Sequence, residues 1–203
     1  WRTIIAACQN KQVPDTWNVG DSCMMAFGKK NYQIDIIGKN HDDYADGSGK
    51  APLTFQMHTC YATEYKMNNS GSNTGGWADC LLRTTGGFKI IKSKMPAEVV
   101  AALKAVTKKT TAGGASSAID TTEDTLFLLS EIEVQGTRTH SYAGEGTQYA
   151  YYQTAANRKK NSAWYLRSPR ISSTTCFCRT GWSGEADWSV ASEVDGIAAA
   201  WCF

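Results

Sequence analysis

Residues 164–203 read WYLRSPRISSTTCFCRTGWSGEADWSVASEVDGIAAAWCF, and this stretch decides the fold that the sequence predicts. Its two ends, residues 164–169 and 196–203, are apolar and aromatic, as packed framework would be. The middle, residues 170–195, mixes tryptophan, arginine and acids with small polar residues and shows no apolar period of a strand or helix. Such a mixture is typical of recognition surfaces. The alternative is an irregular surface loop that carries two partly buried tryptophans.

The size and composition of the chain predict one globular domain, residues 1–203. Of the 203 residues, 42% are hydrophobic and 20% are charged, which suits a folded domain with a sizeable core. A net charge of +2 provides no broad basic surface, so we expect no nucleic-acid partner. No apolar run is long enough to cross a bilayer, so we expect no membrane insertion. Since the sequence starts at Trp1 without a signal peptide, we expect the C-terminal domain of a longer protein.

The residues that carry most chemistry form no recognisable site. Seven cysteines without a repeated short spacing favour buried free thiols over a disulfide framework or a zinc site. His41-Asp42-Asp43 offers possible metal ligands, but a hydrated acidic loop is the favoured interpretation. The chain lacks the GxSxG, HExxH and phosphate-loop lysine motifs. We therefore predict no catalytic residue, no metal and no cofactor.

Periodicity and turn residues predict an α+β fold of short antiparallel strands, two or three helices and much irregular loop. Strands are expected at residues 24–27, 32–38, 53–57 and 126–134. Helices are expected at residues 62–69 and 77–83, and from Pro96 to residue 109, where lysines gather near the helix end. Loops are expected at residues 41–50, 70–76, 110–117 and 140–146.

Motifs spread over nearly the whole chain resemble one known family. The C-terminal motifs are Trp164-x-Leu166-Arg167-Ser168-Pro169, Phe177-Cys178, Gly184 and Asp195-Gly196-Ile197-x3-Trp201-Cys202-Phe203. The upstream motifs are Trp17-x-Val19-Gly20-Asp21, Ile36-Ile37-Gly38-x2-His41-Asp42, Met67-Asn68, Gly75-Gly76-Trp77, Leu82-Arg83 and Leu126-Phe127-Leu128-Leu129-Ser130-Glu131-x-Glu133-Val134. In order and spacing they resemble the C-type-lectin-fold variable proteins of diversity-generating retroelements, found in gut bacteria and their phages.

The resemblance implies a C-type-lectin-like fold that displays varied residues. Residues 1–163 would form the scaffold and residues 164–203 the display region. In that family, error-prone reverse transcription changes adenine-containing codons, and the varied residues bind a macromolecular target. The implied variable, ligand-binding positions lie between the framework residues: Arg170, Thr174, Thr175, Cys176, Arg179, Trp182, Glu185, Asp187, Trp188, Ser189, Val190, Ser192, Glu193 and Val194.

The residue types at these positions suggest how a target would be held. We expect five framework side chains to be buried, namely Trp164, Leu166, Phe177, Ile197 and Phe203. Trp182 and Trp188 would anchor the target, because aromatic side chains dominate the binding energy of many interfaces. Arg170 and Arg179 would pair with its acids, and the acids of the region, Glu185, Asp187 and Glu193, would set its orientation. The expected partner is a protein or glycan on a cell surface, and the expected location is a virion tail or the bacterial cell surface.

Two alternatives remain open on the same scaffold. Trp or Glu cannot arise from an Asn codon changed only at its adenines, so a non-diversified structural module is the first alternative. The second is an oxidoreductase that resembles formylglycine-generating enzymes, which share the lectin-like fold and use two spaced cysteines. Cys176 and Cys178 are too close together for that pattern. A calcium-dependent sugar lectin would carry EPN or QPD followed by WND, and this sequence contains none of them.

Overall fold

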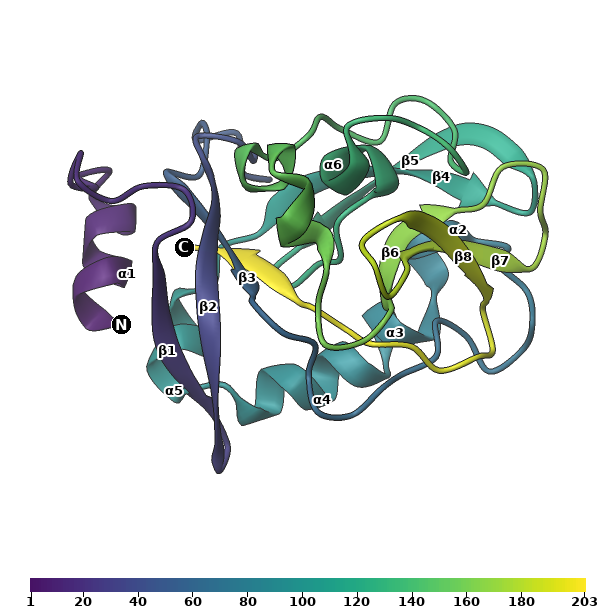
Figure 1. Cartoon of the computed structure of the whole chain (residues 1–203). Helices are drawn as coiled ribbons and strands as arrows, with labels where there is room; N and C mark the ends of the chain where they lie inside the picture. Colours follow the sequence, from purple (N-terminus) through teal and green to yellow (C-terminus); the bar gives the residue numbers. More distant parts are fainter.

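The computed structural model describes residues 1–203 and contains three antiparallel sheets (Figure 1). The largest has the strand order β1–β2–β3–β9 and consists of Ser22–Phe27, Lys30–Lys39, Leu53–Met57 and Ala200–Cys202. The second is a hairpin of β4 (Val106–Gly113) and β5 (Ser116–Asp124). The third has the order β6–β7–β8 and consists of Trp164–Pro169, Cys176–Thr180 and Ala186–Val190. Small antiparallel sheets and few helices confirm the predicted mixed class of fold.

Short helices surround the sheets. The α-helices are α1 (Arg2–Gln9), α2 (Gly76–Asp79), α3 (Leu81–Thr84), α4 (Gly87–Lys94), α5 (Ala97–Ala102) and α6 (Glu131–Gln135). Two 3-10 helices follow, η1 (Ala150–Gln153) and η2 (Ala155–Arg158). In Figure 1, α1 lies beside β1, and α4 and α5 lie along the bottom of the view. None of the helices has the length and apolar character that crossing a bilayer requires.

The largest sheet brings the two ends of the chain together. β9 is the last strand, and it pairs with β3 through Phe55 and Trp201. Trp1 packs edge-on against Phe55 and Phe203, with ring centroids 5.6 and 6.0 Å away. The segment between β6 and β9 is therefore attached at both ends to strands of the fold, and in Figure 1 its sheet lies on the far side of the molecule from α1.

The core contains the residues that were expected to form the framework. It is a cluster of 44 buried residues that includes Trp164, Leu166, Phe177, Ile197 and Phe203, each at most 1% exposed. Burying one large apolar side chain stabilises the fold by roughly 1.5–3 kcal/mol. All seven cysteines are free and all but one are buried, which confirms the prediction of buried thiols except at the partly exposed Cys23.

Several local predictions are also confirmed. The strands expected at residues 24–27, 32–38 and 53–57 correspond to β1, β2 and β3. The helical turns expected at residues 77–83 correspond to α2 and α3, which are separated at Cys80. Residues 140–146 contain neither helix nor strand, as expected. The predictions for the first three strands and for the turns of α2 and α3 are therefore confirmed.

The helix predicted at residues 62–69 is wrong. This segment is irregular, because its backbone hydrogen-bonds to the C-terminal part of the chain. Tyr65 and Asp195 each donate an N–H to the carbonyl of the other, and Asn68 N donates to Ala191 O. Long-range pairing has replaced the local hydrogen bonds that a helix would need.

The long helix predicted from Pro96 and the loop predicted at residues 110–117 are also wrong. The helix ends at Ala102, and Val106–Gly113 forms β4 with alternating burial. The glycine-rich segment is the tip of the β4–β5 hairpin, where the strands turn between Gly113 and Ser116. The valines and lysines whose spacing suggested one long helix are divided between the short helix α5 and the strand β4. In a strand, side chains on one face repeat every two residues.

The strand predicted at residues 126–134 is wrong: its first half forms no strand, and its second half belongs to helix α6. Ser130 caps α6: its Oγ accepts from Glu133 N, and the Glu133 carboxylate accepts from Ser130 N. This reciprocal capping box satisfies two backbone donors at the helix start. Only Phe127 forms a bridge of the predicted strand type, with Ala200. α1 and α4 were not predicted at all.

Candidate binding face

The positions expected to vary lie on and around the sheet β6–β7–β8, and most of them reach solvent. All of them except Cys176 and Ser189 are exposed or partly exposed. Ser189 is opposite the buried Phe177 in the β7–β8 ladder, so its side chain faces inward and is 7% exposed. Cys176 is 4% exposed, and its backbone carbonyl accepts from Asn73 Nδ2. These two assignments are therefore corrections to the predicted surface.

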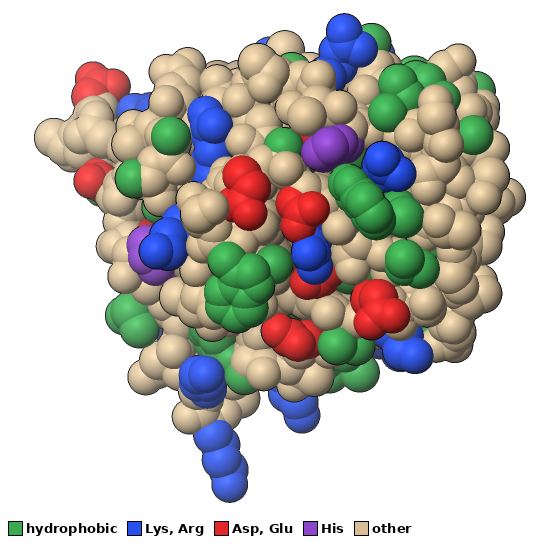
Figure 2. Space-filling view, turned by 45° about the vertical axis from the view of Figure 1, so that its right-hand side comes forward, with side chains coloured by type: hydrophobic (Ala, Val, Ile, Leu, Met, Phe, Trp, Pro, Cys, Tyr) green, Lys and Arg blue, Asp and Glu red, His purple; other side chains and the backbone are tan.

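Large apolar side chains are concentrated on this face. Trp182 is 66%, Val194 51%, Trp188 39% and Ile171 38% exposed. Only three other large apolar residues of the chain are exposed, and they lie elsewhere in the sequence. Figure 2, turned to bring this side forward, shows apolar, acidic and basic side chains intermixed over one area. Tryptophan and arginine are enriched in protein interfaces relative to the rest of the protein surface.

The turn between β7 and β8 holds Trp182 in a fixed position. Glu185 Oε2 accepts from Ser183 N at 3.0 Å and from Ser183 Oγ at 2.5 Å, and Gly181 N donates to Glu185 O at 2.9 Å. The hydrogen bond from the Ser183 hydroxyl lowers the pKa of Glu185. Gly184 has φ +95°, which side chains other than glycine rarely adopt. The tryptophan is thus presented by an internally bonded turn.

The two arginines of the face have different surroundings. Arg179 Nε donates to Asp187 at 2.8 Å, and its NH1 donates to Asp195 at 3.1 Å. Arg170 has no carboxylate partner; its guanidinium lies over the Trp188 ring, 4.4 Å from the centroid, and its buried Nε has no hydrogen-bond partner. Arg179 and Asp187 already satisfy each other, so Arg170 is the arginine of this face that is available to a target.

The segment that returns from β8 to β9 is fixed from both sides. Tyr165 Oη donates to Val190 O at 2.7 Å and to Glu193 O at 3.1 Å. On the other side, the irregular segment at residues 62–69 bonds to the backbone of Asp195. Sequence reasoning missed both supports, since no local pattern marks a contact between segments so far apart in the chain.

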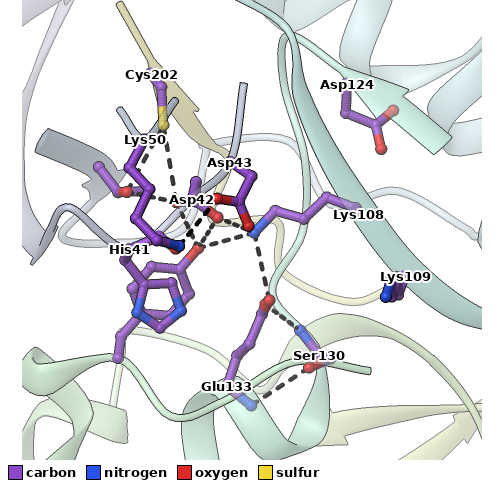
Figure 3. Close-up of polar contacts among 12 residues, drawn as sticks. His41, Asp42, Asp43, Lys50, Lys108, Lys109, Asp124, Ser130, Glu133 and Cys202 are labelled. Atoms are coloured by element: carbon purple, nitrogen blue, oxygen red, sulfur yellow. Dashed lines mark hydrogen bonds and ion pairs between the residues drawn. The ribbon is translucent and has the colours of Figure 1, made fainter. Parts of the chain in front are cut away.

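A buried network of charges includes Asp42, Lys108 and Glu133 (Figure 3). Asp42 accepts from Lys108 and from Tyr149 Oη, the latter at 2.9 Å. Lys108 Nζ is 3.3 Å from Glu133 Oε1, which also accepts from Arg167 NH2 at 2.9 Å. These charged residues come from four places: the end of β2, β4, α6 and β6. The network therefore ties the three sheets and α6 together.

The two acids of the network are charged. Burial raises the pKa of Asp42, but the neighbouring Lys108 ammonium outweighs it and brings the value to about 2. Burial has the same effect on Glu133, and the cations of Arg167 and Lys108 lower its pKa below the usual range. Two anions thus face two cations in a buried site, which satisfies the condition for keeping charges in a protein interior.

The thiol of Cys178, in β7, lies in surroundings unlike those of reactive cysteines. Burial raises the pKa of the Cys178 thiol well above its usual range, whereas reactive cysteines have lowered values. No group of three or more His, Cys, Asp or Glu side chains is placed to hold a metal ion. The arrangement supports contact with a partner through indoles, Arg170 and exposed acids.

Comparison with known proteins places the chain in a family. No curated protein and no solved structure matches it. Residues 51–202 match the family described as Domain of unknown function (DUF6273). That range runs from β3 to β9 and includes both the binding face and most of the charged network. Because the match covers well over half of its length, the chain belongs to the DUF6273 family.

Proposed function

We propose that this chain is a target-binding protein that displays residues 170–194 on a rigid, C-type-lectin-like scaffold. The observation that carries the proposal is the concentration of exposed Trp182, Trp188, Val194 and Ile171 between buried framework strands. Exposed apolar area on one face is costly in water and is recovered when a partner covers it. Indoles beside an unpaired arginine are the side chains that most often dominate binding energy.

The rigid support of the face favours binding over a passive surface loop. The Glu185 turn and the Tyr165 hydroxyl both hold backbone that carries exposed side chains. A partner that meets such a preorganised surface loses less conformational entropy on binding. Side chains on the face can therefore differ while the backbone that presents them stays the same.

The proposal includes the finer fold and the origin of the varied residues. A large sheet closed by the last strand, with a smaller sheet inserted before it, supports the C-type-lectin-like assignment. The buried framework and the mostly exposed positions between its residues support the resemblance to retroelement variable proteins. A near-identical copy of the 3′ coding sequence beside a reverse-transcriptase gene would test that origin, and its absence would favour a non-diversified relative.

The location and the lack of catalysis belong to the same proposal. A binding protein of this kind would act on a virion tail or a bacterial cell surface. An oxidising enzyme with paired cysteines would need a reactive thiol, and the raised pKa of Cys178 argues against that role. Copper-dependent oxidation of a cysteine-containing peptide by the purified chain would contradict the proposal.

Binding is tested by screening the chain against purified cell-surface proteins and glycans. Each binder is then measured again with a Trp182→Ala, Trp188→Ala double variant and with Ile90→Ala, a matched change at an exposed residue on α4. We expect the double variant to lose binding by at least about a hundredfold. The melting temperatures of all three chains should agree within about 4 °C. Retained binding by the double variant, or its unfolding, would contradict the assignment of the face.

A further inference from the structure

A groove beside Trp182 extends the binding face toward the N-terminal part of the chain. It has a volume of about 560 Å³, and its lining includes Trp182, Tyr61, Glu64, Lys30, Asn161 and Ser162. Its size falls within the range of small-ligand sites. We propose that this groove binds a neutral saccharide unit of the target, an inference that rests on the proposed function because Trp182 belongs to both surfaces.

Trp182 gives the groove its open aromatic face, and the second ring of the lining, Tyr61, already stacks on neighbouring tyrosines. Trp182 is 66% exposed, so most of its indole is open to a ligand. Tyr61 is partly buried and stacks between Tyr32 and Tyr65, with centroid distances of 5.7 and 6.5 Å. This row of tyrosines fixes the orientation of the Tyr61 ring. The negative face of an aromatic ring attracts C–H groups, which one side of a pyranose ring presents.

Hydrogen-bonding groups of both kinds accompany the rings. Glu64 Oε1 accepts from Ser162 Oγ at 3.0 Å, and no hydrogen bond within the chain engages its second oxygen. Asn161 Oδ1 accepts from Cys60 N at 2.7 Å, which orients the side chain and leaves its Nδ2 as a donor. Carboxylates accept, amide nitrogens donate, and a sugar hydroxyl can do both. The acceptor of Glu64 and the donor of Asn161 therefore suit the neighbouring hydroxyl groups of a sugar.

The charges of the lining favour a neutral ligand. The lining contains one cation, Lys30, and one anion, Glu64, so it has no net charge that would attract ligands of one sign. The lining contains no aliphatic side chain larger than alanine, and it therefore offers no pocket for an apolar peptide anchor. An uncharged pyranose ring can stack on the exposed indole of the groove, and its hydroxyl groups can bond to the donors and acceptors of the lining.

The inference is tested with defined sugars and the purified chain. The neutral probes are the methyl glycosides of glucose, galactose and N-acetylglucosamine, together with chitotriose; N-acetylneuraminic acid and glucosamine are the charged comparators. Binding is measured by saturation-transfer NMR and by titration of tryptophan fluorescence. We expect at least one neutral probe to bind, and Trp182→Ala to weaken it by about tenfold or more. Glu64→Gln should weaken it several-fold.

Trp188→Ala is the matched control, because it removes an exposed indole of the same face outside the groove. It should leave sugar affinity within about twofold, since additive effects are expected for separate sites. No binding of any neutral probe, a preference for a charged comparator, or equal losses in Trp182→Ala and Trp188→Ala would overturn the inference. If a target is lost on Trp188→Ala while no sugar binds, the proposed function stands and only the saccharide site fails.

Discussion

Arg167 and Arg170 are three residues apart, yet they belong to regions of opposite character. Arg167 is fully buried, and its guanidinium donates to Glu133, to Thr110 Oγ1 at 2.9 Å and to Leu128 O at 2.9 Å. Arg170 has no ion pair and stacks on the partly exposed Trp188. One arginine joins secondary-structure elements in the interior, and the other is available to a partner.

The difference separates the interior that stabilises the fold from the surface that we propose for binding. Interior charges connect residues far apart in the sequence, such as Asp42, Lys108 and Arg167, so losing one leaves others buried without a partner. On the face, the bonds are mostly local, such as Ser183 with Glu185 and Arg179 with Asp187. Substitutions on the face should therefore have small and independent effects on stability.

The largest difference is expected between Arg167→Leu and Arg170→Leu. Arg167→Leu leaves the Glu133 carboxylate and several interior acceptors unsatisfied, and it should lower the free energy of unfolding by about 3–5 kcal/mol. Arg170→Leu should change it by less than about 1 kcal/mol, because it removes only the stacking on Trp188. Urea denaturation of both variants measures the contrast. Equal losses in the two variants would mean that the interior and the face are not distinct.

A second contrast concerns pH. In the wild type, the pKa of Asp42 is about 2, below its usual 3.8, so its contribution to stability is complete above pH 3.8 and is lost as the pH falls through 2. The shift corresponds to about 2 kcal/mol. Lys108→Met removes the cation that lowers this pKa, so burial should then raise the pKa of Asp42, whereas Arg167 still lowers that of Glu133.

The stability of the Lys108→Met variant should therefore depend on pH with the opposite sign. A raised folded pKa gives stability at low pH that is lost as the pH rises, so this variant should be most destabilised near pH 7 and recover part of the loss near pH 4. Free energies of unfolding at pH 3, 4, 5 and 7 test this for both chains. Parallel pH profiles would show that Lys108 does not control the ionisation of Asp42.

A smaller effect is expected for the ion pairs of the face itself. Arg179→Ala removes the partner of Asp187 and Asp195 and should cost about 1 kcal/mol, because the pairs are partly exposed. Glu193→Gln, a charge change at an exposed residue without an ion pair, is the control and should stay within about 0.5 kcal/mol. If Arg179→Ala lowered the free energy of unfolding by more than about 3 kcal/mol, this arginine would stabilise the fold as strongly as the buried network does.

Sequence reasoning predicted the contrast between framework and face, but not what holds the face in place. The apolar runs at residues 164–169 and 196–203 identify buried framework, but the mixed composition between them did not reveal the strands β7 and β8, the first of which is largely buried. The strands at residues 24–27 and 53–57 were predicted correctly, because each is a short apolar stretch next to turn residues. The exposed Trp182 agrees with its predicted place on the surface.

Features that depend on distant partners escaped prediction. Lys108 suggested the end of a helix, whereas in the structure it is buried and paired with Asp42 from the segment after β2. Tyr65 pairs with Asp195 through backbone groups, which no side-chain pattern reveals. The Ser130–Glu133 capping box was a readable local signal that the apolar run before it obscured. Tertiary pairing thus overrode local periodicity in the middle of the chain.

The most direct measurement is the stability of a chain in which six exposed residues of the face are changed at once. The positions are Thr174, Thr175, Trp182, Trp188, Glu193 and Val194, each replaced by serine, and urea denaturation gives the free energy of unfolding. If the interior alone holds the backbone, the loss should stay below about 2 kcal/mol, with one cooperative transition. A loss of about 4 kcal/mol or more, or a broadened transition, would contradict the account, because it would show that residues of the face stabilise the fold.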